Sequence, residues 1–381
     1  MAFAIVGAQV FDGVRLLEDH AVVVENGRIA ALVAVSELPS GMAQTKVAGV
    51  LAPGFIDTQV NGGGGVLFND ARTIDGIAAI GAAHRRFGTT GFLPTLITDT
   101  RAHMIEALAA ARAAIAAGVP GVLGIHIEGP FLSAERKGVH DSALMRPIEE
   151  ADIAILTVPG AGIVLLTVAP EKVPSATIAR LARAGLILSA GHTAADAGTF
   201  AAARAAGLTG VTHLFNAMPP LAGRAPGVVG AALDDPECWC GLIVDLHHVS
   251  PLSLRVAIAA HGWKRMMLVT DAMPTVGSDL TTFDLMGRRV ALTGGKLIAE
   301  DGTLAGSDLD MATAVRNTVR HLGLPLESAL HMASRAPAEF LGLGNDLGRI
   351  AAGYRADLVL LDGDLNAVAT WVGGRRSGES A

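Results

Sequence analysis

The sequence predicts an α/β protein: a (β/α)8 TIM-like barrel with a small discontinuous β-sandwich domain formed by the N- and C-terminal segments. Three observations support this class. Short apolar runs alternate with Ala- and Arg-rich stretches through the 381-residue chain, glycines gather at their joints, and strand-like segments with turn residues occupy both ends. Strands that alternate with helices form a parallel sheet. Eight such strands favour a closed barrel, which needs roughly 250 residues, over an open sheet.

Eight apolar runs are interpreted as the barrel strands. They are short and rich in Val, Ile and Leu, as strands are when both faces are buried. In chain order they cover residues 55–60, 91–97, 122–127, 163–168, 186–189, 211–213, 242–244 and 267–270. Helical stretches separate most of them, at residues 74–87, 103–117, 175–184, 194–206 and 252–261. Two further helices, at 309–322 and 326–341, are expected to complete the barrel.

The small β domain is expected to combine residues 1–52 with residues 345–381, and the barrel to cover residues 53–344. Strand-like segments lie at both ends of the chain, and the pair Asn26-Gly27 favours a tight hairpin turn. A glycine-rich excursion follows the eighth strand at about 276–308. We interpret it as a β-hairpin insertion that lies over the barrel mouth as a lid.

Composition and charge exclude several classes of protein. The net charge is −7, there is one Tyr, and no basic stripe is present, which argues against nucleic-acid binding. No apolar run reaches the roughly 18 residues that a membrane-spanning helix needs. The N-terminus lacks the charged region of a signal peptide. The two cysteines, Cys238 and Cys240, provide no disulfide framework, and we interpret them as buried structural thiols of a cytoplasmic protein.

Four of the apolar runs end on a residue that can bind a metal or move a proton: Glu128, His192, His213 and Asp271. The carboxyl ends of parallel strands meet at one face of a barrel, where active sites are built. Two imidazoles and one carboxylate leave a ligand position open, as catalytic zinc sites do. A single His at a strand end is more often structural, so the argument depends on all four sharing one end.

Several motifs carry a resemblance to a known family. Residues 53–57, Pro-Gly-Phe-Ile-Asp, resemble the opening of the amidohydrolase superfamily, although Gln59 and Asn61 replace the usual His-x-His. Further motifs lie at 126–131, 191–193, 212–219 and 269–272, and with them the chain closely resembles the N-acetylglucosamine-6-phosphate deacetylase family. The most specific part joins residues 213–218, His-Leu-Phe-Asn-Ala-Met, to 223–227, Gly-Arg-Ala-Pro-Gly.

This resemblance implies a role for each matching residue. Glu128, His192 and His213 would hold one divalent metal ion per subunit, with Zn2+ expected, and Asp271 would be the general base and then the general acid. The absence of His-x-His argues against the standard two-metal site, and a weak second metal at Gln59 and Asn61 stays open. Six further residues would bind the substrate: His140, Asn216, Ala217, Arg224, His248 and Leu304.

The reaction implied is hydrolysis of N-acetyl-D-glucosamine 6-phosphate to D-glucosamine 6-phosphate and acetate. The planar fork of Arg224 suits a phosphate. In this family the Arg and His at the phosphate can come from a neighbouring subunit, which predicts a homodimer. Three alternatives stay open at this point: the galactosamine epimer of the substrate, a cyclic amide as in dihydroorotases, and a catalytically silent barrel that serves as an interaction module.

Overall fold

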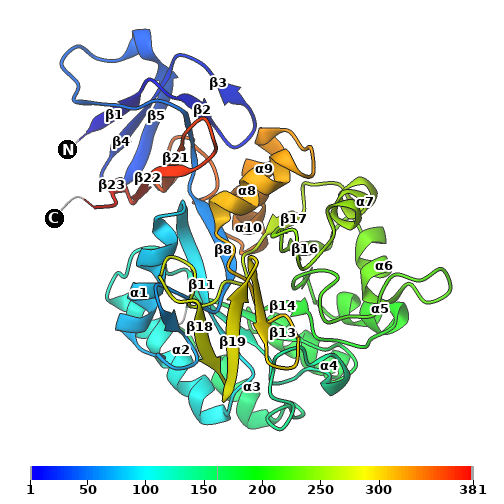
Figure 1. Ribbon diagram of the computed structural model, residues 1–381. Coiled ribbons are helices and arrows are strands. Elements are labelled where there is room, and N and C mark those ends of the chain that lie inside the picture. Colours follow the sequence, from blue (N-terminus) through cyan, green and yellow to red (C-terminus); the bar gives the residue numbers. More distant parts are fainter. Residues whose placement is uncertain (1, 161, 379–381) are drawn as a thin grey trace.

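Eight parallel strands form the barrel of this protein, in a computed structural model that describes residues 2–160 and 162–378 (Figure 1). Each strand pairs with the next in chain order. The strands are β8 (Phe55–Val60), β11 (Thr89–Ile97), β12 (Gly124–Glu128), β13 (Ile163–Val168), β14 (Ile187–Ala190), β15 (Gly210–Val211), β16 (Trp239–Leu242) and β17 (Met266–Leu268). The residues after β17 close the ring, because the N–H of Asp271 donates to the carbonyl of Gln59 at 3.0 Å. The predicted barrel is confirmed.

Helices cover the outside of the barrel where the sequence predicted them. They are α1 (Ile74–Arg85), α2 (Arg101–Ala116), α4 (Ser175–Arg183), α5 (Ala197–Ala205) and α7 (Pro251–His261). Polar caps fix several starts: Thr73, Thr100 and Asp196 each accept a hydrogen bond from the backbone N–H three residues on. Two short helices were not predicted, α3 (Glu150–Leu156) and α6 (Gly227–Asp234).

Two of the expected barrel elements need correction. The seventh strand was expected at 242–244 but is β16, which already begins at Trp239. The helix expected at 326–341 is divided into α9 (Leu326–Ala333) and α10 (Arg335–Phe340), because Ser334 leaves helical geometry with φ −129° and ψ −66°. The preceding helix, α8 (Met311–Arg320), agrees with its prediction.

The insertion after β17 is a three-stranded antiparallel sheet, formed by the segment that was interpreted as a β-hairpin insertion. Its strands are β18 (Thr282–Leu285), β19 (Arg288–Thr293) and β20 (Lys296–Ala299). Its apolar face packs on Ile97, Val139 and Met273, three residues of the loops and strand ends at the barrel mouth. In Figure 1 the sheet stands in front of the barrel. It therefore lies over the face on which the four candidate residues end.

The two ends of the chain meet in a pair of sheets beside the barrel (Figure 1). A four-stranded sheet has the order β5-β4-β1-β6, and a six-stranded sheet has the order β23-β22-β21-β7-β2-β3. Their strands are β1 (Phe3–Val6), β2 (Gln9–Phe11), β3 (Leu16–Leu17), β4 (His20–Glu25), β5 (Arg28–Ala34), β6 (Gln44–Lys46), β7 (Val50–Pro53), β21 (Leu358–Leu361), β22 (Ala367–Val372) and β23 (Arg375–Arg376). The turn between β4 and β5 has φ of 50° at Asn26 and 77° at Gly27, as its sequence predicted.

A separate apolar core joins these two sheets. It includes Ile5, Val22 and Leu51 from the beginning of the chain and Leu358 and Trp371 from its end. The discontinuous β-sandwich is thus present, while the exact domain boundaries at residues 52 and 345 stay a prediction. Within the described residues, no helix combines the length and the apolar character that crossing a membrane requires.

Candidate active site

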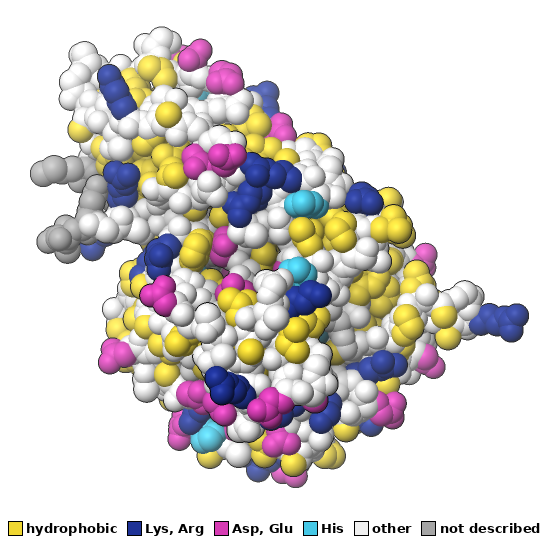
Figure 2. All heavy atoms as spheres, viewed as in Figure 1, with side chains coloured by type: hydrophobic (Ala, Val, Ile, Leu, Met, Phe, Trp, Pro, Cys, Tyr) yellow, Lys and Arg dark blue, Asp and Glu magenta, His cyan; other side chains and the backbone are white. Residues whose placement is uncertain are grey.

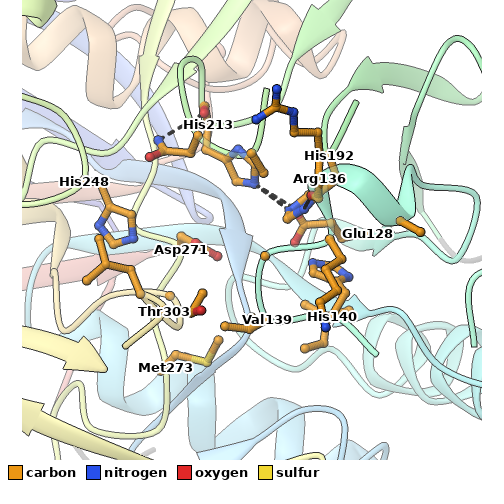
Figure 3. Close-up of a pocket in the computed structure, with 18 of the residues that line it drawn as sticks. Glu128, Arg136, Val139, His140, His192, His213, His248, Asp271, Met273 and Thr303 are labelled. Carbon is orange, nitrogen blue, oxygen red and sulfur yellow. Dashed lines mark hydrogen bonds and ion pairs between the residues drawn. The ribbon is translucent and has the colours of Figure 1, made fainter. Parts of the chain in front are cut away.

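Glu128, His192, His213 and Asp271 converge at the carboxyl ends of their strands, as the sequence predicted. Glu128 is the last residue of β12, and the other three follow β14, β15 and β17 by two or three residues. All four line one cavity of about 510 Å³ (Figure 3). Glu128, His192 and His213 are almost entirely buried, so their polar atoms depend on one another and on whatever enters the cavity.

Three ligand atoms in this cavity are spaced as metal ligands are. Nε2 of His213 lies 3.0 Å from Oε1 of Glu128 and 3.1 Å from Nε2 of His192, and the His192–Glu128 distance is 3.4 Å. The two Nε2 atoms and the Glu128 oxygen therefore face a common point. Ligands at about 2.1 Å from a tetrahedral zinc ion are roughly 3.4 Å apart. The residues therefore fit a single ion, with a position left for water or substrate.

His140 is a further residue close to this centre. Ligand atoms of Glu128, His140 and His192 all lie within 4.8 Å of one another. The closer spacing of the set with His213 makes that set the better ligand group. His140 instead has Nδ1 held by Thr98, whose backbone N–H donates to it at 3.3 Å and whose Oγ1 lies at 2.8 Å. A neutral ring held in this way carries its proton on Nε2.

Burial and neighbouring charge set the pKa values of this centre. Burial alone would raise the pKa of Glu128, but hydrogen bonds from His192 and His213 hold it well below its usual value. Burial lowers the pKa of His140 well below its usual value, and the nearby imidazole of His192 adds to this effect. His140 is therefore a neutral hydrogen-bond donor at neutral pH, while Glu128 is anionic.

Asp271 has the opposite shift. Burial, followed by the negative charge of Glu128, raises the pKa of Asp271 to about 6. A general base works best with a pKa near the operating pH. Figure 3 shows Asp271 between the histidine-rich side of the cavity and His248. The carboxyl of Asp271 can therefore both accept and release a proton near neutral pH.

Gln59 and Asn61 stand where related barrels carry His-x-His. Nε2 of Gln59 donates to both oxygens of Glu128 at 3.2 Å and to Oδ1 of Asp271 at 3.1 Å. Nδ2 of Asn61 donates to the same Oδ1 at 2.6 Å. Gln59 therefore bridges two carboxylates that would otherwise repel each other, and Asn61 contacts Asp271 alone. Their N–H groups cannot bind a cation, whereas Oδ1 of Asn61 is buried with no hydrogen-bond partner among the described residues.

The backbone is strained at three of the four strand-end residues. His192, His213 and Asp271 have φ values of 46°, 34° and 54°, in a region that few residues other than glycine adopt. Ala217, with φ 52°, shares this conformation. Such residues cost about 1–3 kcal/mol each and cluster at functional sites, where the surrounding structure holds them.

Most of the expected substrate-binding residues line the same cavity. His140, Asn216, Ala217, His248 and Leu304 do so. His248 faces the cavity from the side opposite Glu128 (Figure 3), and Asp245 holds its Nδ1 at 2.6 Å. Leu304 belongs to the insertion, which therefore forms part of the cavity wall.

Arg224 does not line this cavity. It is exposed within loop 219–226, between α5 and α6, which projects from the barrel at the right of Figure 1. This loop stands away from the site of its own chain. Within a single copy, the phosphate role expected for Arg224 therefore has no geometric basis.

Several lining residues were missed by sequence reasoning. Met273 and Thr303 line the cavity, and so do Arg136 and Lys137 of the loop after β12. Met and Thr carry no signal of chemistry in a sequence, and the fold of the insertion brings Thr303 to the site. Lys137 carries a positive charge close in sequence to His140, and this charge could have suggested an anionic ligand.

Comparisons with known proteins agree with this geometry. Residues 50–380 match the model of the amidohydrolase family, and residues 2–51 match the NagA composite domain. The chain belongs to the amidohydrolase family. This amidohydrolase is 43% identical to an N-acetylgalactosamine-6-phosphate deacetylase of a Shewanella species, over 97% of its own length and 94% of the relative's. It is 32% identical to an N-acetylglucosamine-6-phosphate deacetylase of Haemophilus influenzae, over 98% and 99% of the two chains.

Solved structures give the same assignment. This amidohydrolase superposes on the N-acetylglucosamine-6-phosphate deacetylase of Pasteurella multocida with a TM-score of 0.96, at 33% identity and with 100% of both chains covered. An enamidase at 16% identity, with a TM-score of 0.64, shares the fold alone. The Pasteurella deacetylase thus resembles this chain over its whole length.

Proposed function

We propose that this amidohydrolase hydrolyses the N-acetyl group of N-acetyl-D-glucosamine 6-phosphate, giving D-glucosamine 6-phosphate and acetate. The observation that carries the proposal is the position of Asp271, which shares one cavity with the Glu128, His192 and His213 cluster. The names of the relatives supply the substrate class. A divalent metal ion held by the cluster would activate water and polarise the acetyl carbonyl; zinc, and one ion per subunit, stay predictions.

Asp271 would move the proton in both halves of the reaction. It takes a proton from the attacking water as the water oxygen forms its bond with the acetyl carbon. The C–N bond then breaks, and Asp271 returns the proton to the departing nitrogen, which leaves as an amine. The pKa of about 6 allows the same carboxyl to accept and to release a proton near neutral pH.

His140 would stabilise the oxygen of the acetyl group. Its Nδ1 is occupied by the N–H of Thr98, so Nε2–H remains to donate. A neutral imidazole already fixed in place needs no reorganisation when negative charge develops on that oxygen. Donors of this kind contribute about 100- to 1000-fold to turnover.

The phosphate would lie at the His248 end of the cavity. Nδ1–H of His248 donates a hydrogen bond to Asp245. Burial alone would raise the pKa of Asp245, but this hydrogen bond holds it below its usual value. The arrangement leaves Nε2 of His248 for the substrate. We further propose that Arg224 reaches this end from a second copy of the chain in a homodimer. A cytoplasmic location likewise stays a prediction.

N-Acetyl-D-galactosamine 6-phosphate is the second candidate substrate. The Shewanella relative named for this epimer has 43% identity, against 32% for the Haemophilus relative named for the glucosamine epimer. The two sugars differ only in the orientation of one hydroxyl. Both would use the same proton transfers and the same phosphate contacts.

Steady-state kinetics on a small set of amides tests the proposal. We expect the purified enzyme to cleave N-acetyl-D-glucosamine 6-phosphate with the highest kcat/KM, and free N-acetyl-D-glucosamine at least about 100-fold less well, because the phosphate contacts are lost. The galactosamine epimer and dihydroorotate complete the set. Asp271→Asn, purified in parallel, should retain its metal and lose turnover, which excludes a contaminating hydrolase.

Each outcome has a distinct meaning. Equal rates with and without the phosphate would refute the roles of His248 and Arg224. A higher kcat/KM on the galactosamine epimer would replace the first candidate with the second. Near-normal turnover by metal-loaded Asp271→Asn would overturn the mechanism. A wild-type protein that neither binds a metal nor cleaves any of these amides would be a catalytically silent barrel.

A further inference from the structure

The two metal-facing histidines differ in how their second ring nitrogen is held. Nδ1 of His192 contacts the carbonyl of Arg136 at 2.9 Å, which fixes the ring. Nδ1 of His213 is buried, and no hydrogen-bond partner for it lies among the described residues. The backbone of His213 itself affects the electrostatics of the ring, but it makes no hydrogen bond with Nδ1. Metal-binding histidines almost always donate this second N–H to a carboxylate, a carbonyl or a water.

A small enclosed cavity lies beneath His213, inside the barrel. Its volume is about 10 Å³, which is close to the least space that one water molecule needs. Apolar residues from the barrel strands form part of its wall, and the polar residues in the wall are Thr58, Gln59, His126, Ser189, Thr212 and His213. A cavity of this size with polar groups on one side suits a single water and nothing larger.

A chain of hydrogen bonds crosses the barrel interior and ends at this cavity. Oγ1 of Thr212 donates to Oγ of Ser189 at 2.9 Å, so the hydroxyl of Thr212 accepts at 2.7 Å from Thr167. Thr167 in turn accepts from Nε2–H of His126 at 2.8 Å. Each hydroxyl proton in the series is used once. The proton of Ser189 is left over, and no acceptor for it lies within hydrogen-bond distance among the residues that the structure describes.

Two unsatisfied donors therefore face one water-sized space: Nδ1–H of His213 and Oγ–H of Ser189. We propose that one structural water fills this cavity, accepts both hydrogen bonds and fixes the ring of His213, which makes Ser189 a positioning residue for metal binding. The inference rests on the proposed role of His213 as a ligand. It assigns to the interior of the barrel a function in tuning the centre above it.

The proposal explains a pattern of residue types on the strands. Ser189 lies on β14 and Thr212 follows β15, at positions where the strands carry otherwise apolar residues. A buried hydroxyl costs free energy unless it is hydrogen-bonded. A chain of such groups is stabilising only when its last proton also finds a partner. The water supplies that partner, and His213 gains the same acceptor.

Metal affinity in the absence of substrate tests the proposal directly. Ser189→Ala removes one of the two anchors of the water, and we expect it to weaken binding of Zn2+ by about 10- to 100-fold. Competition with a chromophoric chelator measures this change. Ser334→Ala is the matched control. Ser334 is equally buried, and its hydroxyl donates to the backbone carbonyl of Leu330. It lies at the junction of α9 and α10, far along the chain from Ser189.

Ser334→Ala should lose thermal stability comparably and retain the zinc affinity of the wild type. Unchanged zinc affinity in folded Ser189→Ala would overturn the proposal. A high-resolution crystal structure of the wild type gives an independent readout: one ordered water within hydrogen-bond distance of both His213 and Ser189 is expected, and clear density without it would refute the idea. This second measurement decides the question even if Ser189→Ala does not fold.

These readouts are separate from the test of the reaction. A wild-type enzyme that binds zinc but cleaves neither sugar phosphate would refute the proposed function and leave the water proposal standing. An active enzyme whose zinc affinity is unaffected by Ser189→Ala would do the reverse.

Discussion

Asp57 lies outside the cavity and holds in place the segment that carries Asp271, the proposed base. It is fully buried on β8. Its carboxylate accepts from Oγ1 of Thr270 at 2.5 Å, from the N–H of Thr270 at 3.3 Å and from the N–H of Gln59 at 3.1 Å. Asp271, with its strained backbone, is the next residue along the chain. The motif that suggested the family at residues 53–57 thus ends on a carboxyl group that closes the barrel and fixes Asp271.

The pKa of Asp57 makes this contact dependent on pH. Burial raises the pKa of Asp57 to about 7, against 3.8 without the fold. The folded protein therefore binds the proton more tightly than the unfolded chain does. The resulting stabilisation is fully present below pH 3.8 and is lost as the pH rises through about 7. A pKa difference of that size corresponds to on the order of 4 kcal/mol.

Replacing Asp57 with the neutral Asn should remove this dependence. We expect the free energy of unfolding, measured by urea denaturation, to fall less steeply between pH 4 and 7 in Asp57→Asn than in the wild type, because only the fall due to Asp271 remains at this site. Asp152→Asn is an informative control with the opposite sign. Burial alone would raise the pKa of Asp152, but its ion pairs with Arg146 and Arg101 lower it.

The stability that Asp152 contributes is therefore lost only as the pH falls below its unfolded value of 3.8. The difference between Asp152→Asn and the wild type should stay constant from pH 4 to 7. A wild-type curve parallel to that of Asp57→Asn would show that the carboxyl of Asp57 does not titrate in this range.

At the scale of elements, the insertion is tied to the loop that carries His140. The guanidinium of Arg288, on β19, donates to the carbonyl of Val139, and it lies 3.9 Å from a carboxylate oxygen of Asp301. Val139 also packs among the apolar residues under the insertion sheet. The sheet thus bears on the residue before His140, so its position and that of the imidazole are linked.

Breaking this tie should affect catalysis more than folding. Arg288→Met retains the apolar stem and removes the donor, and we expect kcat/KM to fall about tenfold or more, because small displacements of an oriented group are costly. Thermal unfolding should move by no more than a few degrees. Arg289→Met is the control: its neighbouring side chain is exposed on the same strand and should tolerate the change. Equal kinetics for the two variants would contradict the link.

The sequence foretold most where hydrophobic runs end abruptly. The strands at residues 55–60 and 163–168 were predicted to the residue, and the chemical groups that follow strands were placed correctly because parallel strands share their carboxyl ends. β16 was misplaced because Gly241 interrupts its apolar pattern. α6 was missed because it starts at Gly227 and contains Gly230, two poor helix formers.

The cavity wall was less predictable than the catalytic residues. Thr303 and Met273 belong to segments with no periodic pattern, and tertiary packing of the insertion decides where they lie. The position of Arg224 depends on a loop whose direction no local rule determines. Strand-end chemistry follows from topology, whereas the walls and projections of a site follow from packing that only the folded chain displays.

At the scale of the whole molecule, one face has the exposed apolar side chains and the projecting loop that an interface with a second copy would use. Loop 219–226 projects beside a groove of about 870 Å³ between α5, α6 and α7. Large apolar side chains are exposed there: Leu221 by 52%, Leu252 by 63% and Val256 by 56%. Figure 2 shows apolar side chains on this side and a basic side chain at the tip of the projection. Exposed apolar patches of this kind mark interfaces, and a symmetric dimer would extend each loop toward its partner.

Mixed dimers test whether Arg224 acts in the neighbouring subunit. Arg224→Ala lacks the phosphate contact and Asp271→Asn lacks the base, so each homodimer should be impaired. A heterodimer of the two would contain one complete site, formed by the Asp271 of one subunit and the Arg224 of the other. Random pairing makes half of the dimers mixed, so equal co-expression should restore roughly a quarter of wild-type activity.

The same experiment separates a shared site from a self-contained one. If Arg224 acted on the site of its own subunit, the mixed dimer would contain no complete site and activity would stay at the level of the parents. That result would leave the phosphate to Arg136 and Lys137, which line the cavity within one chain. Light scattering must show a dimer for the test to apply, and a monomer that is fully active would by itself refute the shared site. Recovery of activity would instead show that the active site is formed by two subunits, and that the projecting loop carries Arg224 into the site of its neighbour.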